Sequence, residues 1–255
     1  MKYSIILPYF GRRGLYNTLV SYAHHYRGRD DYEVIIVEDY KNRGKEHTEL
    51  LRTIRAHKGH VPIRHIRVGA AFKHYYNSAP LINLGVKEAQ GQFIVLTSPE
   101  CFHKTDVLCG FDRVLDHDPD AYVIAAVANG DLAGTLHKNV SEFAEFTYTL
   151  IRWYQHSVHC DRRLHFCSAM SKETFNKIGG MDEGFAFGFW CDDEDFRETA
   201  IQRGIRFVVR DDIVVIHQRH ALASAGIRDK LIDINQAYEK KKIGYLRHPH
   251  PRDSK

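Results

Sequence analysis

The chain has 255 residues, of which 44% are hydrophobic and 27% are charged, a composition that predicts a soluble globular protein with a sizeable core. Lysine and arginine together number 36 and aspartate and glutamate 32, so the net charge is +4. This excess is too small to indicate a dedicated nucleic-acid-binding protein.

Features of membrane, secreted and zinc-thiolate proteins are missing from the sequence. No apolar stretch reaches the roughly 18 to 20 residues that span a bilayer, and Gly11-Arg12-Arg13 interrupts the apolar start of the chain. We therefore expect neither a membrane span nor a signal peptide. The five cysteines form no C-x-x-C pair, which argues against a disulfide framework and fits a reducing, cytoplasmic location.

Short β-branched runs alternate with longer segments of helical periodicity in the first half of the chain. The predicted strands are 3–7, 33–37, 63–68, 93–96 and 122–126, and the predicted helices are 15–26, 45–57, 76–89 and 104–116. Pro8 is expected to end the first strand. The alternation predicts an α/β domain with a mostly parallel sheet and helices on both faces.

The alternation fades after residue 129, where an aromatic-rich stretch, 141–156, is compatible with a helix or with irregular cover. Farther along we expect helices at 171–178, 192–203 and 228–241, a break at Gly179-Gly180, and two separate apolar runs at 207–209 and 213–216. No linker divides the chain, so we expect one domain over 1–220 and a polar, helical C-terminal extension over 221–255.

Open parallel sheets bind ligands beyond the C-terminal ends of their strands. Polar residues follow three predicted strands, in Pro8-Tyr9-Phe10-Gly11-Arg12, Glu38-Asp39 and Thr97-Ser98-Pro99-Glu100-Cys101. Paired acids at a strand end can accept hydrogen bonds from a nucleobase or a ribose, or can simply shape a turn. Because neither a dinucleotide fingerprint nor a Walker loop is present, a diphosphate here would need a metal, basic side chains or a helix N-terminus.

The densest acidic cluster is Cys191-Asp192-Asp193-Glu194-Asp195. Four adjacent acids can stabilise the first turn of a helix through its dipole. In a partly buried cleft they would also raise the pKa of one carboxylate, which suits a general base acting on a sugar hydroxyl. The glycines and aromatic residues of 179–190 favour this second interpretation, because flat apolar faces next to acids are typical of a sugar-binding cleft.

His217-Gln218-Arg219-His220 follows the last apolar run. Two imidazoles three residues apart can bind one metal where the backbone turns. Glu100 would complete an oxygen and nitrogen ligand set acceptable to Mn²⁺ or Mg²⁺. A solvated strand end is the alternative interpretation of these histidines.

Taken in order, these segments resemble nucleotide-sugar glycosyltransferases of the GT-A fold over about residues 3–220. The resemblance is to the large family 2 group, with a C-terminal half similar to the β-1,4-galactosyltransferases and polypeptide N-acetylgalactosaminyltransferases. It rests on Ser4-Ile5-Ile6-Leu7-Pro8-Tyr9, Ile35-Ile36-Val37-Glu38-Asp39, the stretch 76–96, Phe166-Cys167-Ser168-Ala169-Met170, Ile178-Gly179-Gly180-Met181-Asp182 and, with these, Gly188-Phe189-Trp190-Cys191-Asp192-Asp193-Glu194-Asp195-Phe196. It implies a nucleotide-sugar-binding half at 1–128 and an acceptor and catalytic half at 129–220.

The same resemblance implies roles for individual residues. Asp193 would be the base that deprotonates the acceptor hydroxyl, with Asp192 and Glu194 beside it, and Phe189 and Trp190 would bind the acceptor. The implied metal ligands are Glu100, His217 and His220, for Mn²⁺ or Mg²⁺. The implied nucleotide-sugar contacts are Pro8, Tyr9, Arg12, Glu38, Asp39, Tyr76, Asn83 and Ser98.

The chain departs from this family at one motif. The family normally carries Asp-x-Asp after the fourth strand, whereas Thr97-Ser98-Pro99-Glu100-Cys101 offers a single carboxylate. We expect transfer of a hexose from a nucleotide diphosphate sugar, with a UDP-sugar as the first candidate, to a glycan, lipid-linked or other hydroxyl acceptor, with inversion. The alternatives are a non-catalytic carbohydrate-binding relative and a sugar-phosphate nucleotidyltransferase. The basic residues near the C-terminus also leave a nucleic-acid acceptor open; these are Lys240, Lys241, Lys242, Arg247 and Arg252.

Overall fold

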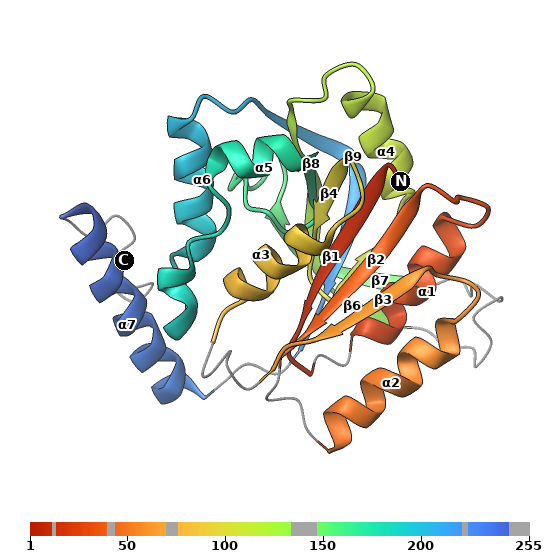
Figure 1. The fold of residues 1–255 in the computed structure, drawn as a ribbon, viewed down its shortest axis with the longest axis horizontal. Coiled ribbons are helices and arrows are strands. Elements are labelled where there is room, and N and C mark those ends of the chain that lie inside the picture. Colours follow the sequence, from red (N-terminus) through yellow and green to blue (C-terminus); the bar gives the residue numbers. More distant parts are fainter. Residues whose placement is uncertain (12–13, 40–43, 70–75, 134–146, 221–223, 245–255) are drawn as a thin grey trace.

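A computed structural model of the chain describes residues 1–11, 14–39, 44–69, 76–133, 147–220 and 224–244. Over these ranges a nine-stranded sheet runs through the molecule, and helices cover both of its faces (Figure 1). The predicted α/β fold class is confirmed.

The first half of the chain follows the predicted alternation closely. Its elements are β1 (Tyr3–Tyr9), α1 (Leu15–His25), β2 (Tyr32–Glu38), α2 (Lys45–His57), β3 (Ile63–Arg67), α3 (Ala79–Glu88) and β4 (Phe93–Leu96). Strands β3, β2, β1 and β4 lie side by side in that order and are parallel. Their C-terminal ends therefore meet at one edge of the sheet, which we call the strand edge.

The sequence analysis expected Pro8 to end β1, but the strand continues to Tyr9. The carbonyl of Tyr9 accepts a hydrogen bond from the backbone of Asp39, so Tyr9 faces β2 and the nitrogen of Pro8 faces the opposite side. On that side the pairing with β4 stops at Ile6. The missing N–H of proline therefore leaves no ladder hydrogen bond unmade.

The second half mixes strand directions. Its elements are β5 (Cys101–His103), α4 (Val107–Leu115), β6 (Tyr122–Ala133), β7 (Thr147–Gln155), β8 (Ser168–Ser171), α5 (Lys172–Ile178), the 3₁₀ helix η1 (Glu183–Phe187), α6 (Asp192–Gln202), β9 (Phe207–Gln218) and α7 (Ala225–Ile243). The sheet order is β3-β2-β1-β4-β8-β6-β9-β5, with β7 on β6. Strands β5, β7 and β8 run antiparallel to their neighbours, whereas the other six strands share one direction, so the sheet is mostly parallel as predicted.

One expectation for the second half was wrong, and two apolar runs proved to belong together. The described part of the aromatic-rich stretch, 147–155, is neither a helix nor irregular cover but the strand β7. The two apolar runs at 207–209 and 213–216 belong to one strand, β9. A register shift against β6 falls between Ala125 and Ala126 and accommodates residues 211–213 as a bulge, which explains the polar interruption.

The predicted break after α5 is confirmed, and its cause is backbone geometry. Ser171 caps the start of this helix by accepting a hydrogen bond from the backbone of Thr174 at 2.9 Å. Gly179 and Gly180 follow the helix with φ angles of 105° and 74°. Glycine adopts this left-handed region without a steric penalty, so the chain can turn sharply here.

The core has two layers, because the central strands are buried on both faces. Ile5 and Leu7 of β1 pack with α1, α2 and α4 on one face of the sheet. Ile6, between them in sequence, packs with α3, α5 and α6 on the other. This arrangement fixes the strand edge rigidly between two helical layers.

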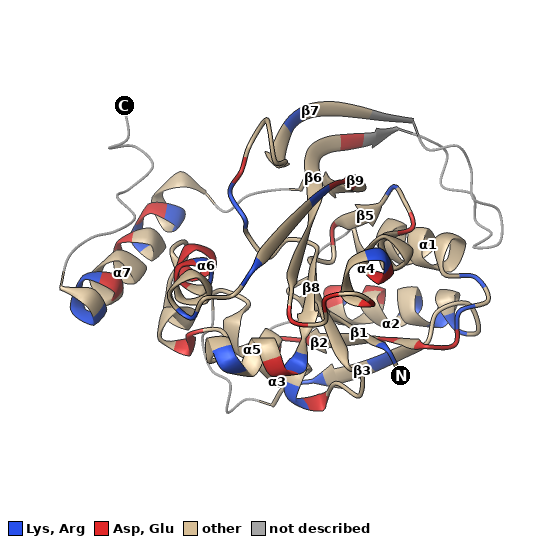
Figure 2. Cartoon of the chain, turned by 90° about the horizontal axis from the view of Figure 1, so that it is seen from above, with Lys and Arg blue, Asp and Glu red and all other residues tan. Residues whose placement is uncertain are grey.

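Helix α7, the described part of the predicted C-terminal extension, packs against the segment that precedes α6. The backbone N–H of Phe189 donates to the carbonyl of Leu231 in α7 at 3.0 Å. Figure 2 shows α7 lying beside α6, whose first turn is acidic. Within the described ranges, no helix has both the length and the apolar character needed to cross a membrane.

Candidate active site

The strand topology brings Glu100 and His217 together. Strand β9 runs parallel to β6 and ends at the strand edge, whereas β5 is antiparallel to β9 and begins there. Cys101, the first residue of β5, is paired with His217 near the end of β9. Glu100 directly precedes β5, so its carboxylate lies next to the imidazoles that follow β9.

Glu100, His217 and His220 form a compact group of potential metal ligands. Glu100 Oε1 lies 3.2 Å from Nε2 of His220 and 3.7 Å from Nε2 of His217. One ligand atom from each residue lies within 4.8 Å of the other two, and no other such group occurs among the described residues. The carboxylate is buried and the histidines are half-buried, so a cation could reach them from one side. One carboxylate with two imidazoles suits Mn²⁺ better than Mg²⁺, which prefers oxygen ligands.

Gln218 holds this group against the start of α1. Its Nε2 donates to the carbonyl of Glu100 at 3.0 Å and lies 3.1 Å from the carbonyl of Gly14, while its Oε1 accepts from Asn17 at 2.7 Å. A Cβ on Gly14 would come within 3.0 Å of the Cα and Cβ of Glu100, so the close approach requires glycine. The sequence analysis gave Gln218 no role, although its place between the two histidines could have suggested one.

The acidic cluster forms the first turn of α6, as predicted. Asp192 is buried, and the side chain of Asp193 is 20% exposed. Burial, reinforced by the charge of Glu194, raises the pKa of Asp193 to about 8. Burial also raises the pKa of Asp192, with the charge of Asp193 as the next cause. Such elevated pKa values are typical of acids that accept a proton during catalysis.

The backbone before this turn is strained. Trp190 and Cys191 have φ angles of 75° and 72°, a left-handed conformation that costs free energy for residues other than glycine. Helix α7 helps to hold it, because Nδ2 of the buried Asn235 donates to the carbonyl of Trp190 at 2.8 Å. Phe189, just before this turn, is 39% exposed, so an aromatic face is available next to the acids.

His165, which the sequence analysis missed, lies beside Asp193. Its Nδ1 is 3.4 Å from Oδ1 of Asp193, and its ring stacks on Phe166 at 5.0 Å. Burial lowers the pKa of His165 to about 4, so the ring is neutral near pH 7. His165 directly precedes the Phe166–Met170 motif but is not part of it, and its place depends on how the segment between β7 and β8 folds back onto α6.

Tyr154 of β7 connects the metal-ligand group with the acidic cluster. Its ring is stacked against His217, with 6.2 Å between centroids and 16° between planes. On the acidic side, the charge of Asp193 adds to burial in raising the pKa of Tyr154. The guanidinium of Arg162 lies 5.0 Å from the centre of the same ring. The metal-ligand group and Asp193 therefore both lie near one aromatic side chain.

The structure brings several implied nucleotide contacts to the strand edge. Pro8 and Tyr9 end β1, Asp39 follows β2, and Ser98 follows β4. Arg12 lies outside the described residues, and Tyr76 is 49% exposed ahead of α3.

Glu38 has structural partners instead of an open position. Its fully buried carboxylate lies 2.9 Å from Nδ1 of His47 and 3.0 Å from Nε2 of His65, with Arg67 at 3.7 Å. These groups from α2 and β3 surround the carboxylate, so Asp39 is the better placed of the two acids to meet a ligand.

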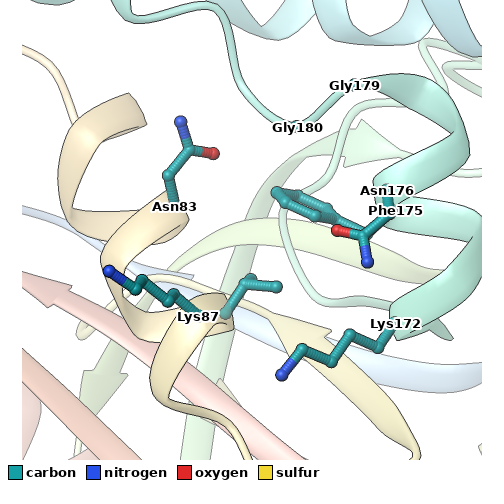
Figure 3. A pocket seen from close by; sticks show the side chains of 8 residues that line it. Asn83, Lys87, Lys172, Phe175, Asn176, Gly179 and Gly180 are labelled. Atoms are coloured by element: carbon teal, nitrogen blue, oxygen red, sulfur yellow. The ribbon is translucent and has the colours of Figure 1, made fainter.

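Asn83 also makes internal contacts. Its Nδ2 donates to the carbonyl of Met181, and its Oδ1 accepts from the backbone N–H of Met181, both at 2.9 Å. It lines a pocket of 450 Å³ between α3 and α5, shown in Figure 3. The lining residues are Asn83, Val86, Lys87, Lys172, Phe175, Asn176, Gly179 and Gly180. Asn83 thereby anchors the loop that leads to η1.

No protein-family model and no curated protein matches the sequence. Solved structures share its fold at low identity. TarS 1–349 of S. aureus in complex with UDP-GlcNAc matches with a TM-score of 0.64 and 15% identity, over 88% of this chain and 60% of that one. The chain has the GT-A fold.

Two further matches agree with this assignment. The mannosyltransferase PcManGT from Pyrobaculum calidifontis, in complex with GDP-Man and Mn²⁺, has a TM-score of 0.57 and 17% identity, over 94% of this chain and 64% of that one. GalNAc-T7 with UDP, GalNAc and Mn²⁺ has a TM-score of 0.60 and 12% identity, over 94% and 50%. This GT-A chain thus spans less than two thirds of the length of each of these proteins.

Proposed function

We propose that this protein is a metal-dependent glycosyltransferase that moves a hexose from a nucleotide diphosphate sugar to an acceptor hydroxyl. The observation that carries the proposal is the position of Tyr154, which stacks on His217 of a Glu-His-His ligand group and interacts with the half-buried acid Asp193. Glycosyl transfer needs a charge-neutralising group at the diphosphate and a base at the acceptor. The chain has candidates for both in one region of a GT-A fold.

For the donor, we propose that the nucleotide lies along the strand edge, with a UDP-sugar as the first candidate. The solved neighbours bind UDP-GlcNAc, UDP and GDP-Man. Asp39 would accept a hydrogen bond from the base, and Pro8, Tyr9 and Ser98 would border the nucleotide. Glu38 would act indirectly, by holding His47 and His65 in place.

Glu100, His217 and His220 would hold Mn²⁺ in the position where the family normally uses Asp-x-Asp. The ion would stabilise the negative charge of the departing nucleoside diphosphate. Gln218 would keep the backbone of Glu100 in register with α1, so that the carboxylate and the two imidazoles stay converged. Because the histidines bind metal only when neutral, affinity should fall in acid.

Asp193 would remove the proton from the acceptor hydroxyl. The acceptor oxygen forms a bond to the anomeric carbon of the donor as the bond from that carbon to the diphosphate oxygen breaks, and the proton goes to Asp193. In-line attack of this kind inverts the anomeric centre. Glu194 would raise the proton affinity of Asp193 through its charge, and Asp192 would hydrogen-bond to it. Phe189 and Trp190 would stack on the acceptor.

Thermal stability against a panel of nucleotides and nucleotide sugars, each with Mn²⁺ or with EDTA, tests this proposal. A ligand that binds only the folded state raises the midpoint of unfolding. We expect one nucleotide class to raise it with Mn²⁺ and not with EDTA, and Asp193→Asn to keep the shift while His217→Ala loses it. The absence of a shift with every nucleotide would instead favour a non-catalytic carbohydrate-binding protein, and pyrophosphate release from a nucleoside triphosphate and a sugar phosphate would favour a nucleotidyltransferase.

A further inference from the structure

We propose that His165 is a positioning residue that donates a hydrogen bond from Nδ1 to Asp193 and thereby favours the ionised form of this carboxylate and orients it for proton removal. The inference rests on the proposed function only in taking Asp193 as the base. It adds a buried partner for that base which no sequence motif indicates.

The geometry around His165 leaves Asp193 as its acceptor. The 3.4 Å separation between Nδ1 and Oδ1 is at the long end of hydrogen-bond distances, and the contact can tighten when an acceptor binds. Nδ1 is buried and makes no hydrogen bond in the described part of the chain, to Asp193 included. A buried N–H without a partner is costly, so a small closing movement that pairs Nδ1 with the carboxylate would satisfy both groups.

Packing fixes the ring of His165 in this orientation. The side chain is 5% exposed and stacks on Phe166 with 13° between the ring planes. Phe196 of α6 meets it edge-on, at 6.3 Å and 78°. A ring held between two phenylalanines cannot turn Nδ1 away from Asp193 without disturbing the core.

The segment that carries His165 is also anchored to α6. Nη1 of Arg197 in α6 donates to the carbonyl of Arg162 at 3.0 Å. Oγ of Ser168 donates to the carbonyl of His165 at 3.1 Å. The histidine and the acid are therefore held by elements that are bonded to each other, as a positioning pair requires.

The protonation state of His165 suits a donor. Burial outweighs the charges of Asp192 and Glu194 and lowers the pKa of the imidazole to about 4. The neutral ring carries one N–H, and an N–H donated to a carboxylate favours its ionised form. His165 therefore opposes the burial that raises the pKa of Asp193, without adding a charge that would itself need to be solvated.

Other groups that face Asp193 leave room for a neutral donor. The ionisable groups that interact with it are Asp192, Glu194, Arg162, Tyr154, Tyr122 and His165. The charge of Glu194 opposes a negative charge at Asp193, whereas the hydrogen bond with Asp192 and the charge of Arg162 favour it. Arg162 is exposed, so solvent and salt screen its effect. His165 is a buried group that would add to the hydrogen bond with Asp192 without carrying a charge.

Two substitutions separate this role from packing. His165→Phe keeps an aromatic ring and removes the donor, whereas His165→Asn puts an amide N–H near the position of Nδ1. We expect His165→Phe to lower kcat by about 10- to 100-fold, to leave the KM for the donor within about twofold, and to move the acidic limb of kcat/KM to higher pH by about one unit. His165→Asn should recover much of this loss. An unshifted pH profile in His165→Phe would overturn the inference.

Two measurements that need no turnover complete the test. Titration of the Asp193 carboxyl, followed by ¹³C NMR and assigned with Asp193→Asn, should move to higher pH in His165→Phe. If that variant does not fold, ¹⁵N NMR of the wild-type imidazole decides, because the inference requires the proton on Nδ1, and a proton on Nε2 would refute it. If the titration moves in His165→Phe but the wild-type protein transfers no sugar, the proposed function alone is refuted. If the titration does not move in His165→Phe but the wild-type protein is active, the role of His165 alone is refuted.

Discussion

Two carboxylates of the candidate site, the fully buried Glu38 and the half-buried Asp193, have different surroundings in the fold. Glu38 is fully buried, but His47, His65 and Arg67 surround it with hydrogen-bond donors and positive charge. Asp193 is flanked by other acids, and burial raises its pKa to about 8. A buried acid that is surrounded by hydrogen-bond donors stabilises a structure. An acid that is buried among like charges is typical of a site where a proton is accepted.

The backbone is regular around Glu38 and strained just before Asp193. Glu38 ends a parallel strand in the middle of a regular ladder. Asp193 follows two consecutive left-handed residues, Trp190 and Cys191, which α7 holds through Asn235. Among the described residues, this strained backbone lies just before α6 and not at Glu38, and we expect substitutions near α6 to affect turnover most.

The largest expected effect is on turnover in Asp193→Asn. Removal of a general base should lower kcat by about 10³-fold, while the affinity for the nucleotide sugar stays within about twofold, because the donor contacts lie at the strand edge. Steady-state kinetics and calorimetric titration of the donor measure the two quantities. Asp233→Asn, an exposed carboxylate of α7, is the control, and near wild-type turnover in Asp193→Asn would remove the base assignment.

Loss of a metal ligand should come next in size. We expect Glu100→Ala, His217→Ala and His220→Ala each to weaken Mn²⁺ binding by about 100-fold, and the wild type to prefer Mn²⁺ over Mg²⁺ because two of the three ligands are imidazoles. Calorimetric titration with each ion tests both statements. His60→Ala, which changes an exposed histidine outside the ligand group, should bind Mn²⁺ normally. Equal affinity for Mn²⁺ in all four variants would mean that the ion binds elsewhere.

The comparison also explains how much the sequence could predict. Helix α2 and strand β4 were predicted with their observed bounds, because their periodicity is local. Strands β5 and β8 have three and four residues and pair with distant segments, so no local pattern marks them. The secondary structure of residues 1–128 was accordingly easier to predict than that of residues 129–220.

The candidate site divides along the same line. Glu100, His217 and His220 were chosen for their chemistry, and the pairing of β5 with β9 brings them together. The sequence analysis missed His165 because a single histidine carries no spacing signal. The partners of Glu38 were also invisible, since a sequence does not say which basic side chains will surround a buried acid.

A moderate effect is expected from Asn235→Ala, which tests whether α7 supports the strained turn. The substitution removes the 2.8 Å hydrogen bond to the carbonyl of Trp190 and should cost about 1–3 kcal/mol of stability. Because the turn leads into α6, kcat should fall by more than the donor KM rises. Asn176→Ala on the exposed face of α5 is the matched control. A stability loss with unchanged kcat would show that α7 supports the fold without affecting the base.

The smallest effect concerns stability against pH. The pKa of Asp193 is raised from 3.8 to about 8 by burial and by Glu194, so the folded state binds more protons than the unfolded state between these values. Stability from this group is therefore fully present below about pH 4 and is lost as the pH rises through about 8. Asp193→Asn cannot ionise, so its Tm should exceed that of the wild type by a margin that grows from pH 5 to pH 9, by about a few degrees. Glu38→Gln should instead lower the Tm at every pH in this range, because it removes a carboxylate from its hydrogen-bond partners His47 and His65. A constant Tm difference between Asp193→Asn and the wild type would mean that Asp193 is ionised throughout, and the contrast between the two acids would then be one of backbone strain alone.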